Sequence, residues 1–265
     1  MYNESKGEKK VKSFTNINYG KTNHPDQVLD IYLPETETFP VFVYFHGGGL
    51  EEGDKDMPVL TEYLIKRGIA LVSCNYRIYP EAVFPDFVKD AACAVDWVKR
   101  NIQSYGNATK VFVGGSSAGG YISLLLCFDK KYLAPYKINP DEIDGFIHDA
   151  GQPTSHFNVL RERGLDSRMI LVDETAPLYH IRENKNYPPM LILFSDNDME
   201  NRYEQSQLML STLKHFNGEL PQIEYKIMHG THCQYVIDDS NPDEYVFGKL
   251  VADYIEKQIN ARGER

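Results

Sequence analysis

The sequence is poor in the features that mark disulfide-bonded proteins. Its 265 residues include four cysteines, Cys74, Cys93, Cys127 and Cys233, and no two of them form a C-x-x-C pair. The first three lie in apolar stretches, where a free cysteine usually behaves as a small buried hydrophobic residue. We therefore expect no disulfide framework, which fits a reducing compartment.

Long apolar runs and excess positive charge are also missing. No segment approaches the ~18 apolar residues that a membrane span needs, and residues 1–12 are polar and lysine-rich, unlike a signal peptide. The formal net charge is -10, which disfavours binding to nucleic acids and to anionic membranes. We therefore expect a cytoplasmic protein without a nucleic-acid or membrane partner.

What the sequence does contain is an alternation of short apolar strands with amphipathic helices. Strands are predicted at residues 13–19, 27–33, 41–45, 69–75, 110–113, 143–148, 190–194 and 223–228, and helices at 60–66, 87–102, 121–127, 203–215 and 245–259. Regular interleaving of strands and helices predicts an α/β fold, with a mostly parallel eight-stranded sheet and helices on both faces. The first two strands are expected to form an antiparallel edge.

One segment does not fit this alternation. Residues 152–187 are irregular and far longer than the about 2–6 residues that usually connect a helix and a strand. We interpret them as a small lid insertion over the active site within a single domain, residues 1–265. Phe157, Leu160 and Tyr179 are expected to line the acyl or alcohol side of the substrate.

A glycine-rich turn follows the apolar residues 110–113. Residues 115–119 read Gly-Ser-Ser-Ala-Gly, which matches the G-x-S-x-G motif with Ser117 at the nucleophile position and Ser116 outside it. The motif serine lies on a tight, strained turn, so its neighbours must be small, and the following helix N-terminus favours negative charge. The alternatives are a glycine turn without chemistry and, more weakly, a P-loop, for which the required lysine is missing.

A second glycine run follows the first central strand. Residues 46–49 read His-Gly-Gly-Gly, which matches the H-G-G-G loop of lipases and esterases. Attack on an ester carbonyl creates an oxyanion, and glycines let backbone N–H groups approach it without a Cβ clash. We assign the oxyanion hole to the N–H groups of Gly48, Gly49 and Ala118, with His46 supporting the loop. A flexible glycine turn is the alternative.

Two aspartates and two histidines compete for the remaining roles. Asp196 and Asp198 follow the seventh predicted strand, and His229 and His232 follow the eighth, as the order serine, acid, histidine requires. We predict Asp198 as the acid, with Asp196 as the fallback, and His232 as the base because His229 has less freedom to reach over the sheet. The four residues could also ligate a metal, but no H-E-x-x-H or similar spacing supports one, so no metal is expected.

Further residues accompany these motifs and carry a family resemblance. They are the Leu-Asp-Ile-Tyr-Leu-Pro run at 29–34, Tyr76-Arg77, Pro80-Glu81, Phe84-Pro85, Asp90 and Trp97. With them the chain resembles the α/β-hydrolase esterases related to hormone-sensitive lipase. The run at 29–34 and the short length look closer to the bacterial feruloyl and acetyl-xylan esterase-like branch, and kynurenine formamidases are similar too. Over residues 27–260 the resemblance implies an α/β-hydrolase fold and a Ser-His-Asp esterase of small acyl groups without a cofactor.

Two departures from that family narrow the expected substrate. Ser116 stands where lipase-like members often carry aspartate, and the large N-terminal cap of that group is missing. Both favour a compact small-molecule ester. The acidic residues Glu51, Glu52 and Asp54 follow the glycine loop, where they either disfavour anionic substrates or form a solvated turn.

Three functions remain open from the sequence. The first is a serine carboxylesterase for short acyl esters, including acyl groups on sugars or feruloyl-type esters. The second is an amidase such as a kynurenine formamidase, and the third is a non-catalytic small-molecule-binding homologue. The set Ser117, Asp198 and His232 argues against the third, because fold alone does not determine function but a full set of reacting groups points to chemistry.

Overall fold

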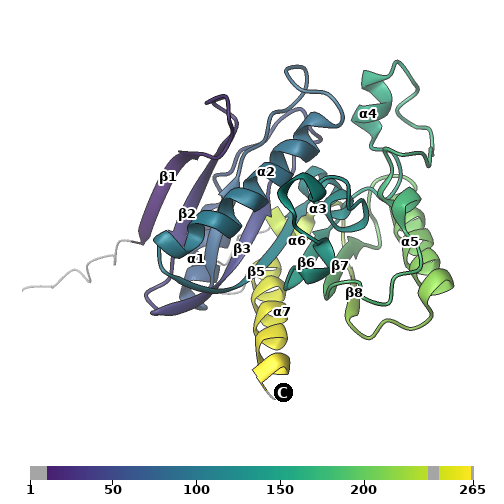
Figure 1. Cartoon of the computed structure of the whole chain (residues 1–265). Helices are drawn as coiled ribbons and strands as arrows, with labels where there is room; N and C mark the ends of the chain where they lie inside the picture. The colour runs from purple at the N-terminus through teal and green to yellow at the C-terminus, as the bar shows by residue number, and fades with distance from the viewer. Residues whose placement is uncertain (1–10, 238–244, 264–265) are drawn as a thin grey trace, which may run out of the picture.

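The computed structural model describes residues 11–237 and 245–263, with side chains for residues 11–236 and 245–261. Eight strands form one sheet in the order β1-β2-β4-β3-β5-β6-β7-β8 (Figure 1). Their bounds are β1 Lys12–Asn18, β2 Val28–Leu33, β3 Thr38–Phe45, β4 Ala70–Cys74, β5 Asn107–Ser116, β6 Gly145–Asp149, β7 Met190–Ser195 and β8 Ile223–Met228. β2 is antiparallel to both β1 and β4, and the other pairs are parallel. The predicted mostly parallel sheet with an antiparallel edge is therefore confirmed.

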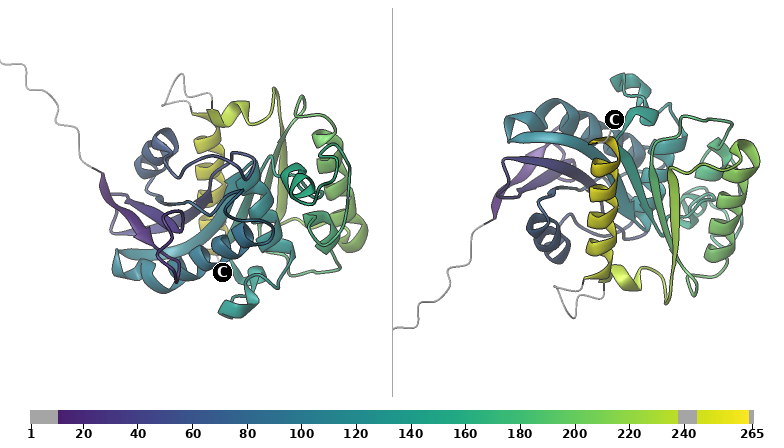
Figure 2. Two further views of the ribbon diagram at one scale, coloured as in Figure 1. Left: turned by 90° about the horizontal axis from the view of Figure 1, so that it is seen from above. Right: turned by 90° about the horizontal axis from the view of Figure 1, so that it is seen from below.

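Helices cover both faces of the sheet. They are α1 Pro58–Lys66, α2 Asp86–Asn101, α3 Ala118–Phe128, α4 Phe157–Glu162, α5 Arg202–Asn217, α6 Gln234–Ile237 and α7 Val246–Gly263. Figure 2 shows α1 and α7 on one side of the sheet and α2 with α3 on the other. None of the helices in the described ranges is both long and apolar enough to cross a bilayer.

The two faces have separate apolar cores because successive side chains of a strand point to opposite sides. In β3, Val41, Val43 and Phe45 pack toward α2 and α3, whereas Phe42 and Tyr44 pack toward α1 and α7. All five side chains are at most 1% exposed. A strand buried on both faces reads as a continuous apolar run, which is why the sequence located this strand correctly.

Short helices account for most of the differences from the sequence-based expectation. Residues 157–162, expected to be irregular, form α4, and residues 234–237 form α6. The nucleophile strand is also longer than predicted, because β5 continues through Gly114 to Ser116. A Cβ on Gly114 would lie 2.3 Å from the carbonyl oxygen of Ile147 in β6, so a glycine is needed where the two strands pair.

The parallel strands bring three loops to one edge of the sheet. The carboxyl ends of β5, β7 and β8 lead directly to the predicted serine, aspartate and histidine. In open α/β sheets this edge is where ligands bind. α4 stands apart from the sheet beyond these strand ends (Figure 1).

Candidate active site

Ser117 occupies the turn between β5 and α3. Its φ and ψ angles are 53° and -110°, a conformation that residues with a side chain rarely adopt. The turn is tight because Phe45 of β3 lies against it: a Cβ on Gly119 would be 1.9 Å from the Phe45 carbonyl oxygen. The G-x-S-x-G glycines therefore allow the strand-to-helix turn that holds the serine side chain out from the backbone.

His232 joins the serine to the predicted acid. Its Nε2 lies 2.8 Å from Ser117 Oγ, and its Nδ1 lies 2.6 Å from Asp198 Oδ1. The Asp198 side chain is fully buried, and that of His232 is 21% exposed. Asp198 Oδ1 also accepts the N–H of Met199, which fixes the carboxylate toward the imidazole. In this arrangement His232 can take the serine proton while the carboxylate holds its tautomer and orientation.

The competing residues form a second pair outside this chain of hydrogen bonds. His229 Nδ1 lies 2.8 Å from Asp196 Oδ2, and the His229 side chain is 97% exposed. Their hydrogen bond raises the pKa of His229 and lowers that of Asp196. The four residues weighed as metal ligands are thus divided between two histidine–aspartate pairs.

The loop that carries the base is held from two sides. The Ser195 hydroxyl at the end of β7 donates to the main-chain oxygen of Thr231 at 2.9 Å. The Thr231 N–H donates in turn to Gln234 Oε1 at the start of α6. His232 is therefore enclosed between an anchor on the neighbouring strand and the first turn of a helix.

The glycine loop lies against the nucleophile. A Cβ on Gly47 would be 3.3 Å from Ser117 Cβ, and Gly48 and Gly49 have φ angles of 106° and 64°. Ala118 is the first residue of α3, so its N–H belongs to the unsatisfied group at a helix N-terminus. The three predicted oxyanion donors thus come from the two segments that border Ser117.

His46 has the supporting place that the sequence suggested. Its ring is buried and stacks on Tyr76 with centroids 4.5 Å apart, and its Nδ1 lies 2.6 Å from the Gly47 carbonyl oxygen. Burial lowers the pKa of His46. The Tyr76 hydroxyl donates to the His46 carbonyl oxygen at 2.9 Å. These contacts fix the start of the glycine loop.

α4 reaches this loop from the segment expected to form a lid. The Asn158 amide donates to the Gly49 carbonyl oxygen, and Arg161 forms an ion pair with Glu51 at 2.8 Å. A Cβ on Gly49 would also touch the ring of Phe157 at 3.4 Å, whereas Tyr179 is 45% exposed and lies over the Arg182 guanidinium. Of the predicted lining residues, Phe157 is the one that these contacts place beside the glycine loop.

Three buried polar residues near the triad were not anticipated from the sequence. They are Asp149 at the end of β6, Arg202 at the start of α5 and Tyr235 on α6. The Arg202 guanidinium donates to Ala150 O at 3.1 Å and to Gln152 Oε1 at 2.9 Å. Burial lowers the pKa of Arg202, and attraction to Asp198 opposes this in part. The sequence offered one signal for two of them: a charged residue at the end of an apolar strand, as for Asp149, or at the start of a helix, as for Arg202.

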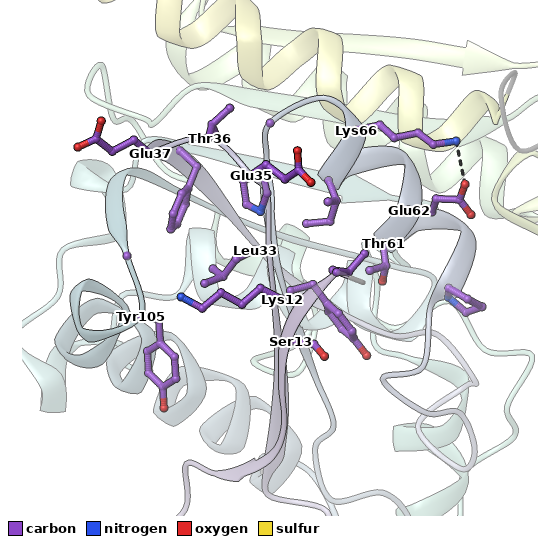
Figure 3. Close-up of a pocket in the computed structure, with 18 of the residues that line it drawn as sticks. Lys12, Ser13, Leu33, Glu35, Thr36, Glu37, Thr61, Glu62, Lys66 and Tyr105 are labelled. Carbon is purple, nitrogen blue, oxygen red and sulfur yellow. Dashed lines mark ion pairs between the residues drawn. The ribbon is translucent and has the colours of Figure 1, made fainter. Parts of the chain in front are cut away.

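A hollow lies at the other end of the sheet (Figure 3). It is lined by the β2–β3 turn, by α1 and by the residues that precede β5, with Glu62 and Lys66 forming an ion pair at 2.8 Å. β3 and β5 begin here, whereas Ser117 follows the end of β5. This hollow therefore lies away from Ser117, and the hydrogen-bonded set around Ser117 remains the candidate site.

Part of the sequence resembles known esterases. Residues 29–159, which include the glycine loop and the nucleophile turn, match the BD-FAE family model. The chain is 35% identical over 106 residues to carboxylesterase NlhH of Mycobacterium tuberculosis, covering 38% of this chain and 33% of that protein. It is 34% identical over 118 residues to the probable isoprenylcysteine alpha-carbonyl methylesterase ICMEL2 of Arabidopsis thaliana, covering 43% of this chain and 28% of that protein. The matched parts thus span about a third of these relatives or less.

Solved structures share the fold over nearly the whole chain. A truncated carbohydrate esterase from gut microbiota has a TM-score of 0.73 at 20% identity, covering 94% of this chain and 96% of that one. Esterase B from Lactobacillus rhamnosis has a TM-score of 0.72 at 19% identity, covering 96% and 89%. The predicted α/β-hydrolase fold is confirmed. The chain thus has the fold of these esterases, and over residues 29–159 its sequence is similar to that of α/β-hydrolase esterases.

Proposed function

We propose that the protein is a serine carboxylesterase with Ser117 as nucleophile, His232 as general base and acid, and Asp198 as the orienting acid. The hydrogen-bonded chain from Ser117 Oγ through the His232 ring to Asp198 Oδ1 carries the proposal. Ser117 attacks the ester carbonyl as its proton moves to His232 Nε2. The histidine then gives that proton to the departing alcohol, and water hydrolyses the acyl-enzyme by the same route.

The oxyanion of each tetrahedral intermediate would be held by the N–H groups of Gly48, Gly49 and Ala118. The contact between Gly47 and Ser117 supports this assignment, because it brings the loop within reach of the atom that the serine attacks. Each such donor typically contributes about 3–4 kcal/mol of transition-state stabilisation. No cofactor is needed for this chemistry.

The substrate proposed is a small ester with a short acyl group. Residues 152–187 would act as the lid, and their closeness to the site through Phe157 and Asn158 supports a compact pocket. Polar lid residues suit a hydroxylated alcohol such as a sugar, in line with the carbohydrate esterase among the structural relatives. The free cysteines and net charge of -10 support the expected cytoplasmic location and the absence of a nucleic-acid partner.

A panel of 4-nitrophenyl esters from acetyl to decanoyl tests the activity and the acyl length together. We expect kcat/KM to peak at acetyl to butyryl, because each further methylene gains about 0.8 kcal/mol only where a pocket receives it. Ser117→Ala should abolish turnover, whereas the matched control Ser116→Ala should keep it. A fluorophosphonate probe should label Ser117 in the parent protein.

Two results would contradict this function. Full activity in Ser117→Ala, or labelling of Ser116, would remove the nucleophile assignment. A kcat/KM that keeps climbing beyond octanoyl would refute the short-acyl substrate while leaving ester hydrolysis in place. Adding N-formylkynurenine and acetylated sugars to the panel separates an amidase from an esterase that acts on sugars.

A further inference from the structure

Asp149 touches the nucleophile turn through its main chain. It is the last residue of β6 and pairs in register with Ser116 of β5. Its carbonyl oxygen accepts the N–H of Ser117 at 2.8 Å. The position of Asp149 therefore fixes the main chain from which the serine side chain projects.

The carboxylate of the same residue reaches the segment that carries the base. The Tyr235 hydroxyl donates to Asp149 Oδ1. Tyr235 lies on α6, which begins two residues after His232. One residue thus bonds to the main chain of Ser117 and to the helix that follows His232, although Ser117 and His232 are 115 residues apart.

Burial of this carboxylate is unfavourable for the folded protein. Asp149 is 0% exposed, and its Oδ2 has no hydrogen-bond partner among the described residues. Burial raises its pKa to about 6. The Ser116 hydroxyl is close enough to lower that pKa but makes no hydrogen bond of ordinary geometry. A buried and half-satisfied carboxylate costs stability, so its presence points to a role in the reaction.

The groups that face Asp149 come from three segments. Tyr235, Cys233 and His232 belong to the segment after β8, Asp198 to the loop after β7 and Tyr44 to β3. His232 is the group among them that becomes cationic, and its charge lowers the pKa of Asp149 while Asp198 raises it. The same attraction stabilises the positive charge that the ring carries after it accepts the serine proton.

We propose that Asp149 is a positioning residue of the reaction: it sets the distance between Ser117 and His232, and its charge stabilises the imidazolium formed during acyl transfer. As the bond between Ser117 Oγ and the acyl carbon forms, the serine proton passes to His232 Nε2, and the positive charge appears close to both Asp198 and Asp149. This role rests on the proposed ester hydrolysis. It adds a second carboxylate to the charge environment of the histidine.

Two variants separate the charge of Asp149 from its hydrogen bond. Asp149→Asn keeps the size and an acceptor oxygen but removes the charge, and Tyr235→Phe removes the donor but keeps the charge. The matched control is Tyr32→Phe, which deletes a hydroxyl that donates to the Asp30 carboxylate in the hollow at the other end of the sheet. The measurements are kcat and KM on 4-nitrophenyl acetate, the pH profile of kcat/KM and the rate of labelling by a fluorophosphonate.

Asp149→Asn should lower kcat and the labelling rate on the order of 10- to 100-fold with KM little changed, since misplaced reacting groups cost rate rather than binding. The acid limb of its kcat/KM profile should move to lower pH, because a negative charge near the base is lost. Tyr235→Phe should lower kcat without that movement. Tyr32→Phe should keep the parent values.

The outcomes distinguish this proposal from the function on which it rests. A parent protein that hydrolyses no ester defeats the proposed function. An active parent with parent-like kcat and acid limb in Asp149→Asn defeats the positioning role alone. If Asp149→Asn does not fold, parent-like kcat in Tyr235→Phe defeats it as well, and loss of folding in both variants leaves Asp149 only a structural role.

Discussion

At the residue scale, this chain carries two aspartate–histidine pairs that differ mainly in their surroundings. Asp198 and His232 face Ser117 with the carboxylate fully buried, whereas Asp196 and His229 meet at the surface. The two aspartates are two residues apart and follow the same strand. The two pairs have the same residue types, so the candidate triad is distinguished by the burial of its carboxylate and by the orientation of its side chains toward Ser117.

This arrangement supplies its own control for the acid assignment. Asp198→Asn should lower kcat by roughly 10³- to 10⁴-fold, because an amide cannot hold the imidazole in the required tautomer. Asp196→Asn should cost less than about fivefold, since an exposed ion pair is worth at most ~1 kcal/mol. Steady-state kinetics on 4-nitrophenyl acetate decide between them. Reversed effects would move the acid by two residues.

The sequence supported part of this site and missed another part for a physical reason. Ser117 and the glycine loop belong to short sequence motifs, and the backbone conformation that each motif needs can be inferred from neighbouring residues. Asp149 and Tyr235 belong to no such motif, and an aspartate at the end of an apolar strand is usually exposed. Only the pairing of β5 with β6 and the path of the chain after β8 bury that carboxylate.

At the element scale, α4 is the feature that links the connecting segment after β6 to the reacting groups. Asn158 bonds to the glycine loop, and Glu162 accepts the N–H of Phe84 from the loop after β4 at 2.9 Å. The helix has six residues, too few to be stable alone. Its position therefore depends on these side-chain contacts, which periodicity in the sequence does not reveal.

Substitutions on the two sides of α4 should have unequal effects. Asn158 is buried, and its loss leaves the Gly49 carbonyl unpaired beside two predicted oxyanion donors, so Asn158→Ala should lower kcat by about 10-fold or more with a smaller change in KM. Arg161→Ala removes an ion pair that is half exposed and should change kcat by less than about fivefold. Both variants are assayed on the same ester. Equal losses of kcat in Asn158→Ala and Arg161→Ala would contradict a specific role of Asn158 in holding the glycine loop.

At the scale of the whole molecule, the buried histidines make the fold sensitive to acid. His148 is 1% exposed, stacks on Phe146, and has its Nδ1 2.8 Å from Ser123 Oγ. Burial lowers its pKa to about 3 from the model-peptide value of 6.5. Between these values the unfolded chain binds the extra proton and the folded chain does not, so stability falls as the pH falls through this window.

Replacing His148 should remove this contribution. His148→Phe should weaken the pH dependence of the unfolding free energy by about 1.4 kcal/mol per pH unit below 6.5. Urea unfolding between pH 7 and 4.5 measures it. Ser123→Ala keeps the imidazole buried and should keep the parent slope even if its stability is lower. An unchanged slope in His148→Phe would show that the imidazole is protonated in the folded state.

The strand order has a consequence for how the protein acquires activity. His232 follows β8, an edge strand whose single partner among the described residues is β7. It meets a serine 115 residues earlier in the chain. Contacts between distant parts of a chain close late in folding, because they require the intervening loop to be ordered. A molecule with a complete central sheet in which β8 has not yet paired would thus be compact but inactive. Stoichiometric labelling of Ser117 by a fluorophosphonate during refolding would therefore measure the number of fully folded molecules and would not include molecules that are only collapsed.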